Sequence, residues 1–199
     1  MLVEMNDHLV VIEGPQNDER ATAVIAEVKK TVPNKPIKYV VNSHHHFDHA
    51  GGLGAFAAEG ATIITHDANK AFLEQSLAAP RTVQPDKLAQ SGKKAMVEGM
   101  QDKRVLSDGT RTVELYLIQG SAHHDGLIMA YFPKEKLLVE ADAYTPGAPN
   151  ASPPAQPNPF SVNLYENIER LKLSVDQILP LHGRKVPLAE LQKWIGKTS

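Results

Sequence analysis

Four histidines and one aspartate fall within six consecutive residues, His44–His49, which read His-His-His-Phe-Asp-His. The apolar segment Ile37–Val41 precedes this run and predicts a short buried strand, and Gly51-Gly52 follows it. Neutral imidazole and carboxylate are ligand types that suit zinc, and such ligands usually come clustered on a stiff loop. The sequence therefore predicts a metal-binding loop at the end of a buried strand.

The spacing within the run suggests which side of the loop each side chain occupies. Side chains alternate sides along an extended segment, so His44 and His46 are expected to share one face. A turn after His46 can direct Asp48 and His49 toward a second ion. His45 points to the opposite side, so it is expected to pack against the loop rather than bind a metal.

Composition and net charge exclude several classes of function. The 199 residues fit one domain, residues 1–199, and the formal net charge of -2 gives no electrostatic footprint for nucleic acid or an anionic membrane. The chain has no cysteine, which excludes disulfides, thiolate catalysis and thiolate metal ligands. With nucleic acid and membrane partners not expected, a small-molecule substrate is the expected partner.

Nothing in the sequence predicts a membrane segment. No run of about 18 consecutive apolar residues occurs, so no transmembrane helix is expected. The acidic start, Met1–Asp7, lacks the order of a basic and then an apolar segment that signal peptides show. A cytoplasmic location is expected for the chain as written, although a signal peptide would be missing if the N-terminus were shortened.

The order of predicted elements favours layered α/β or α+β architecture, with helices outside stacked sheets. Strands and helices alternate early, consecutive strands follow, and alternation resumes. The segment Pro80–Gly109 shows no clear pattern, and Pro146–Pro159 predicts a long loop. The predicted strands are Val3–Ile12 as a hairpin or bent strand, Ile37–Val41, Ala61–Thr65, Thr112–Ile118, Leu127–Phe132, Lys136–Ala141 and Gln177–Leu181. The predicted helices run from an Asn17 or Asp18 cap to Lys30, from Gly51 to about Ala58, from an Asp67 cap to about Ala78, from Tyr165 to Leu173 and from Pro187 to Ile195.

Four segments together resemble a known family. The pattern His-x-His-x-Asp-His at His44–His49 is followed by Ala-Gly-Gly. Gly120–His123 precedes a strand, a turn and Leu137–Asp142, and Leu179–Gly183 supplies a late Pro-Leu-His-Gly turn. In this order, over residues 8–199, the segments resemble those of the metallo-β-lactamase superfamily. The resemblance implies a four-layer αββα sandwich, in which two mixed β-sheets are flanked by helices and the metals lie at one edge.

The resemblance also implies a ligand set for two Zn²⁺ ions, with iron or manganese as alternatives. His123 is preferred over the neighbouring His124 as the third histidine, because its spacing from Asp142 matches the family's ligand. One ion would be held by His44, His46 and His123, the other by Asp48, His49 and His182, with Asp142 bridging both.

The implied activity is hydrolysis of an ester, lactone or lactam carbonyl by a metal-bridging hydroxide. Asp48 would ligate one ion and accept a hydrogen bond from that hydroxide. Tyr144 could reach an oxyanion or leaving group, or could instead be a loop aromatic packed over the site. The same fold also carries mononuclear iron persulfide dioxygenases and phosphodiesterases, which are the alternative readings.

The N-terminus departs from the family pattern. Members usually place a further strand pair before the strand that leads to their first helix, whereas here Met1–Glu13 alone precede that turn. The region Val3–Ile12 would then expose an edge able to pair with another chain. A homo-oligomer joined near this edge is the expectation, with a two-fold dimer as its commonest form.

Overall fold

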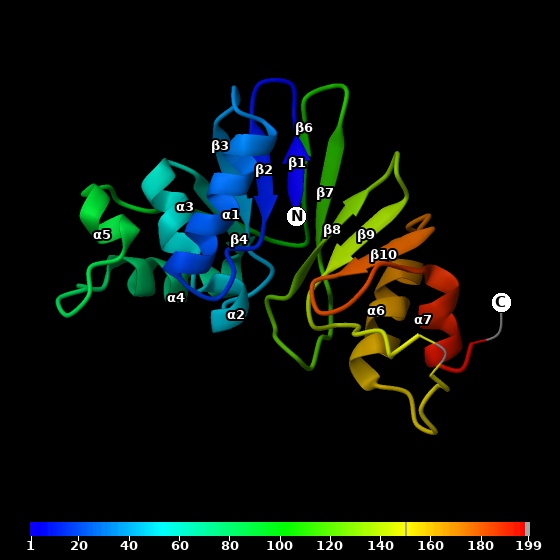
Figure 1. Ribbon diagram of the computed structural model, residues 1–199. Helices are drawn as coiled ribbons and strands as arrows, with labels where there is room; N and C mark the ends of the chain where they lie inside the picture. The colour runs from blue at the N-terminus through cyan, green and yellow to red at the C-terminus, as the bar shows by residue number, and fades with distance from the viewer. Residues whose placement is uncertain (150, 198–199) are drawn as a thin grey trace. The chain divides into compact units, whose positions relative to one another are not determined.

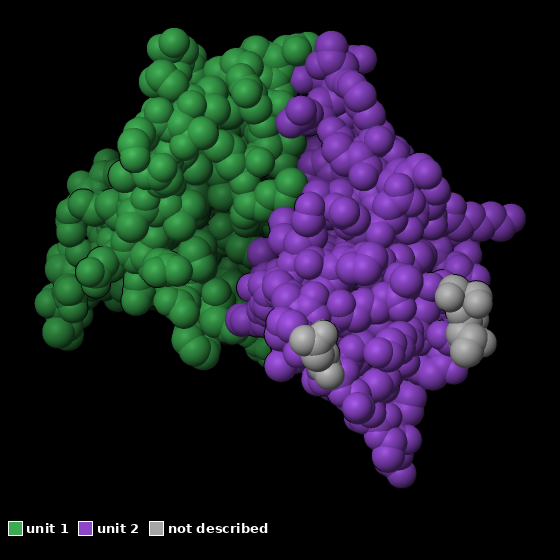
Figure 2. Space-filling model, turned by 45° about the vertical axis from the view of Figure 1, so that its right-hand side comes forward, with its two compact units in different colours: residues 1–101 green, residues 102–199 purple. Residues whose placement is uncertain are grey.

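The computed structural model describes residues 1–149 and 151–197, in two compact units (Figure 2). Unit 1 is Met1–Gln101 and unit 2 is Asp102–Ser199. Each unit holds one mixed sheet with helices packed on it (Figure 1). The single domain expected over residues 1–199 includes Asn150 and the last two residues, which lie outside the described residues, and it stays a prediction.

The sheet of unit 1 has five strands in the order of the chain. A hairpin forms β1 and β2, which pair antiparallel with Val3 opposite Val10, and this confirms the predicted hairpin. The remaining neighbours pair in parallel. The strands are β1 (Leu2–Glu4), β2 (Leu9–Ile12), β3 (Ile37–Val41), β4 (Thr62–His66) and β5 (Met96–Met100).

Helices cover one face of this sheet through a continuous apolar core. Ile25 of one helix and Phe56 of another pack with the strand residues Val11, Val40 and Ile63, all at most 5% exposed. The opposite face of the sheet is buried as well, as Val10 and Ile64 show. The helices are α1 (Asp18–Thr31), α2 (Phe47–Ala50), α3 (Leu53–Glu59), α4 (Asp67–Ala78) and α5 (Lys87–Ser91).

Two helix starts show how the sequence sets the boundaries. The side chain of Asn17 accepts a hydrogen bond from the Arg20 amide at 2.8 Å and caps α1, as predicted. The cap of α4 is His66 rather than Asp67, because the His66 Nδ1 accepts from the Ala68 amide at 3.1 Å. Asp67 then lies in the first turn, where a carboxylate complements the helix dipole.

The described residues of unit 2 form a six-stranded sheet and two helices. Its strands pair antiparallel except for the parallel pair β9–β10, and the strand order is β11-β10-β9-β8-β7-β6. The apolar core lies between this sheet and both helices. The elements are β6 (Lys103–Ser107), β7 (Thr112–Leu117), β8 (Ile128–Phe132), β9 (Leu137–Glu140), α6 (Pro159–Arg170), β10 (Gln177–Pro180), β11 (Val186–Pro187) and α7 (Leu188–Trp194).

Two segments differ from the sequence-based expectation. Helix α6 begins at Pro159 rather than Tyr165, because the Asn158 side chain accepts from the Phe160 amide at 2.9 Å and proline suits the first helical turn. The unassigned segment Pro80–Gly109 contains α5, β5 and β6. Within the described residues, no helix has both the length and the apolar character needed to cross a membrane.

Strand β1 lies at one end of the strand order in its sheet, as the predicted edge requires. Within unit 1 it pairs with β2, through Leu2 opposite Val11 and Glu4 opposite Leu9. Glu4 of β1 forms an ion pair with Lys35, which precedes β3, at 2.7 Å, and charged side chains on an edge strand discourage aggregation. The homo-oligomer expected at this edge stays a prediction.

Two glycines allow the chain to pass closely where α2 meets the loop after β2. A Cβ on Gly51 would overlap the carbonyl oxygen of Gln16, and a Cβ on Gly52 would lie 2.6 Å from the Ala21 Cβ. The amide of Gly52 also donates to the Gly14 carbonyl at 3.0 Å. Glycine is therefore required at positions 51 and 52, which follow Ala50 at the end of the histidine-rich run.

Gly51→Ala is expected to lower the free energy of unfolding by about 1–3 kcal/mol, because the new methyl group must displace backbone atoms. Gly54, inside α3, is the matched control, since a Cβ there would first meet the Leu88 Cβ at an ordinary 3.6 Å. Gly54→Ala is expected to be neutral or to stabilise by up to about 1 kcal/mol. Urea unfolding measures both, and equal midpoints for the two variants would contradict the close approach at Gly51.

Candidate metal centre

The histidine-rich loop begins directly after β3 and is tied down at several points. The Asn42 side-chain amide donates to the His49 carbonyl at 3.1 Å, and the Ser43 amide donates to the Glu13 carboxylate at 2.9 Å. Both contacts are buried. The helix α2 then turns the chain at Phe47, whose ring is 75% exposed. The loop is therefore held rigidly at the C-terminal end of the parallel strands.

His44 and His46 converge, as their spacing predicts. The His44 ring is fully buried, and its Nδ1 lies 2.9 Å from the Ser43 hydroxyl. Its Nε2 lies 2.9 Å from the Nδ1 of His46, with the two rings edge to face. One nitrogen of each imidazole thus points toward the same place, as two ligands of one ion would.

Asp48 and His49 form a second pair at the start of α2. The His49 Nε2 lies 3.3 Å from the Asp48 Oδ2, and its Nδ1 lies 3.4 Å from the Glu13 Oε2. His49 is 2% exposed and Glu13 is 6% exposed. The buried Glu13 carboxylate therefore faces the second nitrogen of a predicted ligand, an arrangement that orients metal-binding histidines.

Glu13 is the residue that the sequence-based reasoning missed. It follows the apolar strand β2 and enters the core with a left-handed backbone, at a φ of 78°. A non-glycine residue in that conformation costs free energy and often marks a functional site. An acidic residue directly after a fully buried strand, ahead of Gly14-Pro15, is the signal that could have found it.

In unit 2, Asp142 lies between two histidines that are far apart in the sequence. Its Oδ2 lies 3.1 Å from the His123 Nε2, and its Oδ1 lies 3.2 Å from the His182 Nε2. Asp142 follows β9 with a left-handed backbone, at a φ of 60°. The buried Glu140 carboxylate accepts from the amides of Ala143 and Tyr144 at 3.0 and 3.1 Å, which fixes this turn.

His123 and His124 differ in what they contact. His123 reaches Asp142, and its ring also packs edge to face on Phe160, with centroids 5.7 Å apart. The His124 Nδ1 accepts from the Gly126 amide at 3.0 Å, within its own turn. The preference for His123 over His124 as the ligand stays a prediction.

The other histidines of these segments have structural contacts. The His45 Nδ1 lies 3.1 Å from the Asn69 side-chain oxygen, and its ring stacks on Phe72 with centroids 4.4 Å apart. His45 therefore packs against α4, as expected. His66 caps the same helix.

Tyr144 lies in the core of unit 2 and is 2% exposed. Burial raises the pKa of its phenol above the usual range, and the negative charge of Glu190 raises this pKa further. Its ring packs near α6 and α7 rather than standing open to solvent. A catalytic role for this phenol stays a prediction.

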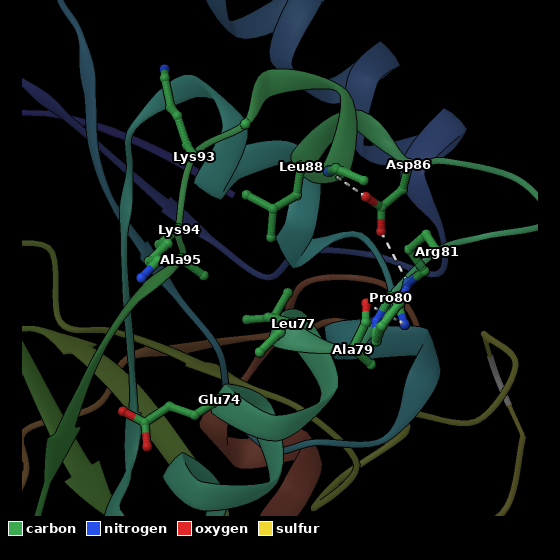
Figure 3. Close-up of a pocket in the computed structure, with 13 residues that line it drawn as sticks. Glu74, Leu77, Ala79, Pro80, Arg81, Asp86, Leu88, Lys93, Lys94 and Ala95 are labelled. Carbon is green, nitrogen blue, oxygen red and sulfur yellow. Dashed lines mark hydrogen bonds and ion pairs between the residues drawn. The ribbon is translucent and has the colours of Figure 1, made fainter.

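A cavity of about 510 Å³ in unit 1 lies away from the predicted ligands. Figure 3 shows Leu77 and Leu88 facing its interior, while Asp86 binds Arg81 at 3.2 Å on one side. Lys94 extends from another side. No residue of the histidine-rich loop lines this cavity, so it is a poor candidate for the reaction centre.

The donor atoms of each unit cluster closely. Within unit 1, the candidate ligand atoms of His44 and His46 lie within 4.8 Å of each other, and so do those of Asp48 and His49. Within unit 2, the candidate ligand atoms of Asp142 lie within 4.8 Å of those of His123 and of those of His182. Imidazole and carboxylate donors without thiolates fit a divalent transition metal.

Known proteins of similar sequence and structure share this fold. The sequence model of the metallo-beta-lactamase superfamily matches residues 1–175. A metallo-beta-lactamase from Pontibacter korlensis is 17% identical, with a TM-score of 0.71 over 98% of this chain and 84% of that one. FIM-1 of Pseudomonas aeruginosa, in its mono-zinc form, is 18% identical, with a TM-score of 0.66 over 98% and 79%. At these identities the likeness establishes the fold alone.

A curated relative aligns over a shorter stretch. The linear primary-alkylsulfatase of Pseudomonas sp. (strain ATCC 19151) is 33% identical over 58 residues, which are 29% of this chain and 11% of that protein. The match to the superfamily, in contrast, spans both the histidine-rich loop and the Asp142 turn. Together with the His and Asp groups described above, it implies that the protein binds a divalent metal. The chain belongs to the metallo-beta-lactamase superfamily.

Proposed function

We propose that the protein is a dinuclear zinc hydrolase acting on an ester, lactone or lactam. The observation that carries this proposal is the position of Asp142, whose two carboxylate oxygens face different imidazoles, those of His123 and His182. Each oxygen of a carboxylate can bind a separate ion, and each ion then needs its own nitrogen ligands. Two imidazoles, one on each oxygen, are the arrangement of a carboxylate shared by two ions.

The residues would divide between the ions by their pairings within each unit. His44 and His46 converge on one point, whereas Asp48 and His49 form a separate pair. We assign His44, His46 and His123 to one ion, and Asp48, His49 and His182 to the other, with Asp142 on both. The proposed ligands are imidazole nitrogens and carboxylate oxygens, with imidazole in the majority. This combination supports zinc over magnesium or calcium.

The chain's own residues would orient the reaction. Divalent ions held by these residues would lower the pKa of a coordinated water and polarise a carbonyl oxygen. Asp48, 30% exposed in its side chain, would accept a hydrogen bond from the attacking water while binding a metal. Glu13 would hold the His49 Nδ1 and fix that ring's orientation.

A second candidate reaction is hydrolysis of a sulfate ester. The short match to a linear primary-alkylsulfatase favours it over the phosphodiesterase reading, which has no comparable support. The iron persulfide dioxygenase reading predicts one firmly held iron rather than two zinc ions. Each of these alternatives gives a different result in the same set of assays.

A substrate panel tests the proposed function. It contains p-nitrophenyl esters, acyl homoserine lactones, a chromogenic cephalosporin, bis-p-nitrophenyl phosphate and an alkyl sulfate. We expect zinc-dependent turnover of at least one carbonyl substrate, abolished by a chelator and restored by added Zn²⁺. Turnover confined to the phosphodiester or the alkyl sulfate would overturn the carbonyl assignment, and oxygen consumption on glutathione persulfide would favour the dioxygenase.

His123 and His124 provide a matched pair of variants at adjacent positions. His123→Ala is expected to lower the metal content from about two ions toward one per chain and to reduce kcat at least 100-fold, since a ligand is lost. His124→Ala, which removes a contact within its own turn, should retain the metal. Elemental analysis of both purified proteins measures this. Metal loss in the His124 variant alone would show that the ligand assignment is displaced by one residue.

A further inference from the structure

Unit 2 contains a cleft of about 610 Å³ where the proline-rich loop (residues 145–149 and 151–158) meets the start of α6 and the end of α7. None of the described residues that line it is charged. Three aromatic rings and three prolines are among its described lining residues, and the Tyr144 ring borders the cleft from the core at 2% exposure. The rings are Tyr144, Phe160 and Trp194, and the prolines are Pro154, Pro157 and Pro159.

The cleft begins beside the metal ligands of unit 2. Phe160 lines the cleft and packs edge to face on His123. Ser161, another lining residue, donates from its hydroxyl to the Ala143 carbonyl at 3.2 Å, immediately after Asp142. A substrate whose reacting group lies at these ligands therefore has this cleft within reach.

The wall of the cleft is anchored rather than loosely placed. A Cβ on Gly147 would overlap the Trp194 indole, so the loop backbone packs directly on that ring. The Arg184 guanidinium binds the Glu190 carboxylate at 2.6 Å and donates to the Gly147 carbonyl at 3.4 Å. Next to His182, Gly183 approaches Pro146 so closely that a Cβ there would lie 2.8 Å from the proline ring.

We propose that this cleft, the apolar subsite, binds an uncharged aliphatic chain of the substrate. The inference rests on the proposed function and narrows it to esters or lactones with a medium-length acyl or alkyl chain. A charged group placed there would lose hydration without gaining a counter-ion. Prolines and aromatic rings instead present apolar surface, and each buried methylene should tighten binding by about two- to fourfold.

Trp194 makes the binding directly observable, because it is the single tryptophan of the chain. Octanamide, which is neutral and has an eight-carbon chain, is titrated against the metal-free and the zinc-loaded protein while Trp194 emission is recorded. Acetamide is the short-chain control. We expect a saturable change of emission with octanamide and none with acetamide over the same range. An absent response to octanamide in both forms would overturn the proposal.

Gln156→Lys places a positive charge in the uncharged lining at an exposed position. It is expected to weaken octanamide binding at least tenfold. Gln84→Lys is the matched control, because Gln84 is exposed in unit 1 and does not line the cleft. Equal weakening of octanamide binding by both variants would show that the effect comes from the added net charge and not from its position. That result would contradict the subsite.

Hydrolysis of p-nitrophenyl esters from acetate to octanoate adds an independent readout. The ratio of kcat/KM for octanoate over acetate should exceed ten in the parent protein and should fall in Gln156→Lys but not in Gln84→Lys. If octanamide binds and no ester is hydrolysed, the proposed function fails while the subsite stands. If esters are hydrolysed without chain-length preference and without an emission change, the subsite alone fails.

Discussion

The turn that carries Asp142 is the constraint on which the rest of the site in unit 2 depends. A short aspartate must present one oxygen to His123 and the other to His182, although these residues follow different strands. The left-handed backbone at Asp142 costs free energy, and the buried Glu140 carboxylate offsets it by accepting two amide hydrogen bonds from the next residues. Folding of this unit therefore sets the geometry of the carboxylate before any ion binds.

The same design recurs in unit 1, with Glu13 in place of Glu140. Glu13 also follows a buried strand, and it accepts from the Ser43 amide while facing His49. In both units a buried carboxylate holds a ligand segment at the end of a strand. A divalent cation bound near these buried carboxylates would stabilise the native state as well as supply the chemistry.

Local signals in the sequence were sufficient for most of the fold. The hairpin, the Asn17 cap and the strand Ile37–Val41 follow from turn residues and apolar periodicity, which act over a few neighbouring positions. The segment Pro80–Gly109 was not predictable in this way. Its strands β5 and β6 carry alternating exposed residues, such as Met96 and Val105, and gain their structure by pairing with β4 and β7.

The residues of the candidate site also differ in whether a local sequence signal could predict them. The His44–His49 motif was visible because its members are adjacent in sequence, and the other ligands were found through the resemblance to a family. The position of Glu13 after a buried strand could have marked it as unusual, but its role depends on a contact with His49, 36 positions later, that only folding creates. Tyr144 was placed by sequence proximity to Asp142, yet its ring lies in the core of unit 2.

The central claim is that Asp142 is shared by two ions. Anomalous diffraction from crystals of the zinc-loaded protein, measured on both sides of the zinc absorption edge, tests it most directly. The account predicts two zinc peaks, each within coordinating distance of a different Asp142 oxygen, one bound by His123 and the other by His182. A single peak, or two peaks of which only one contacts Asp142, would contradict it.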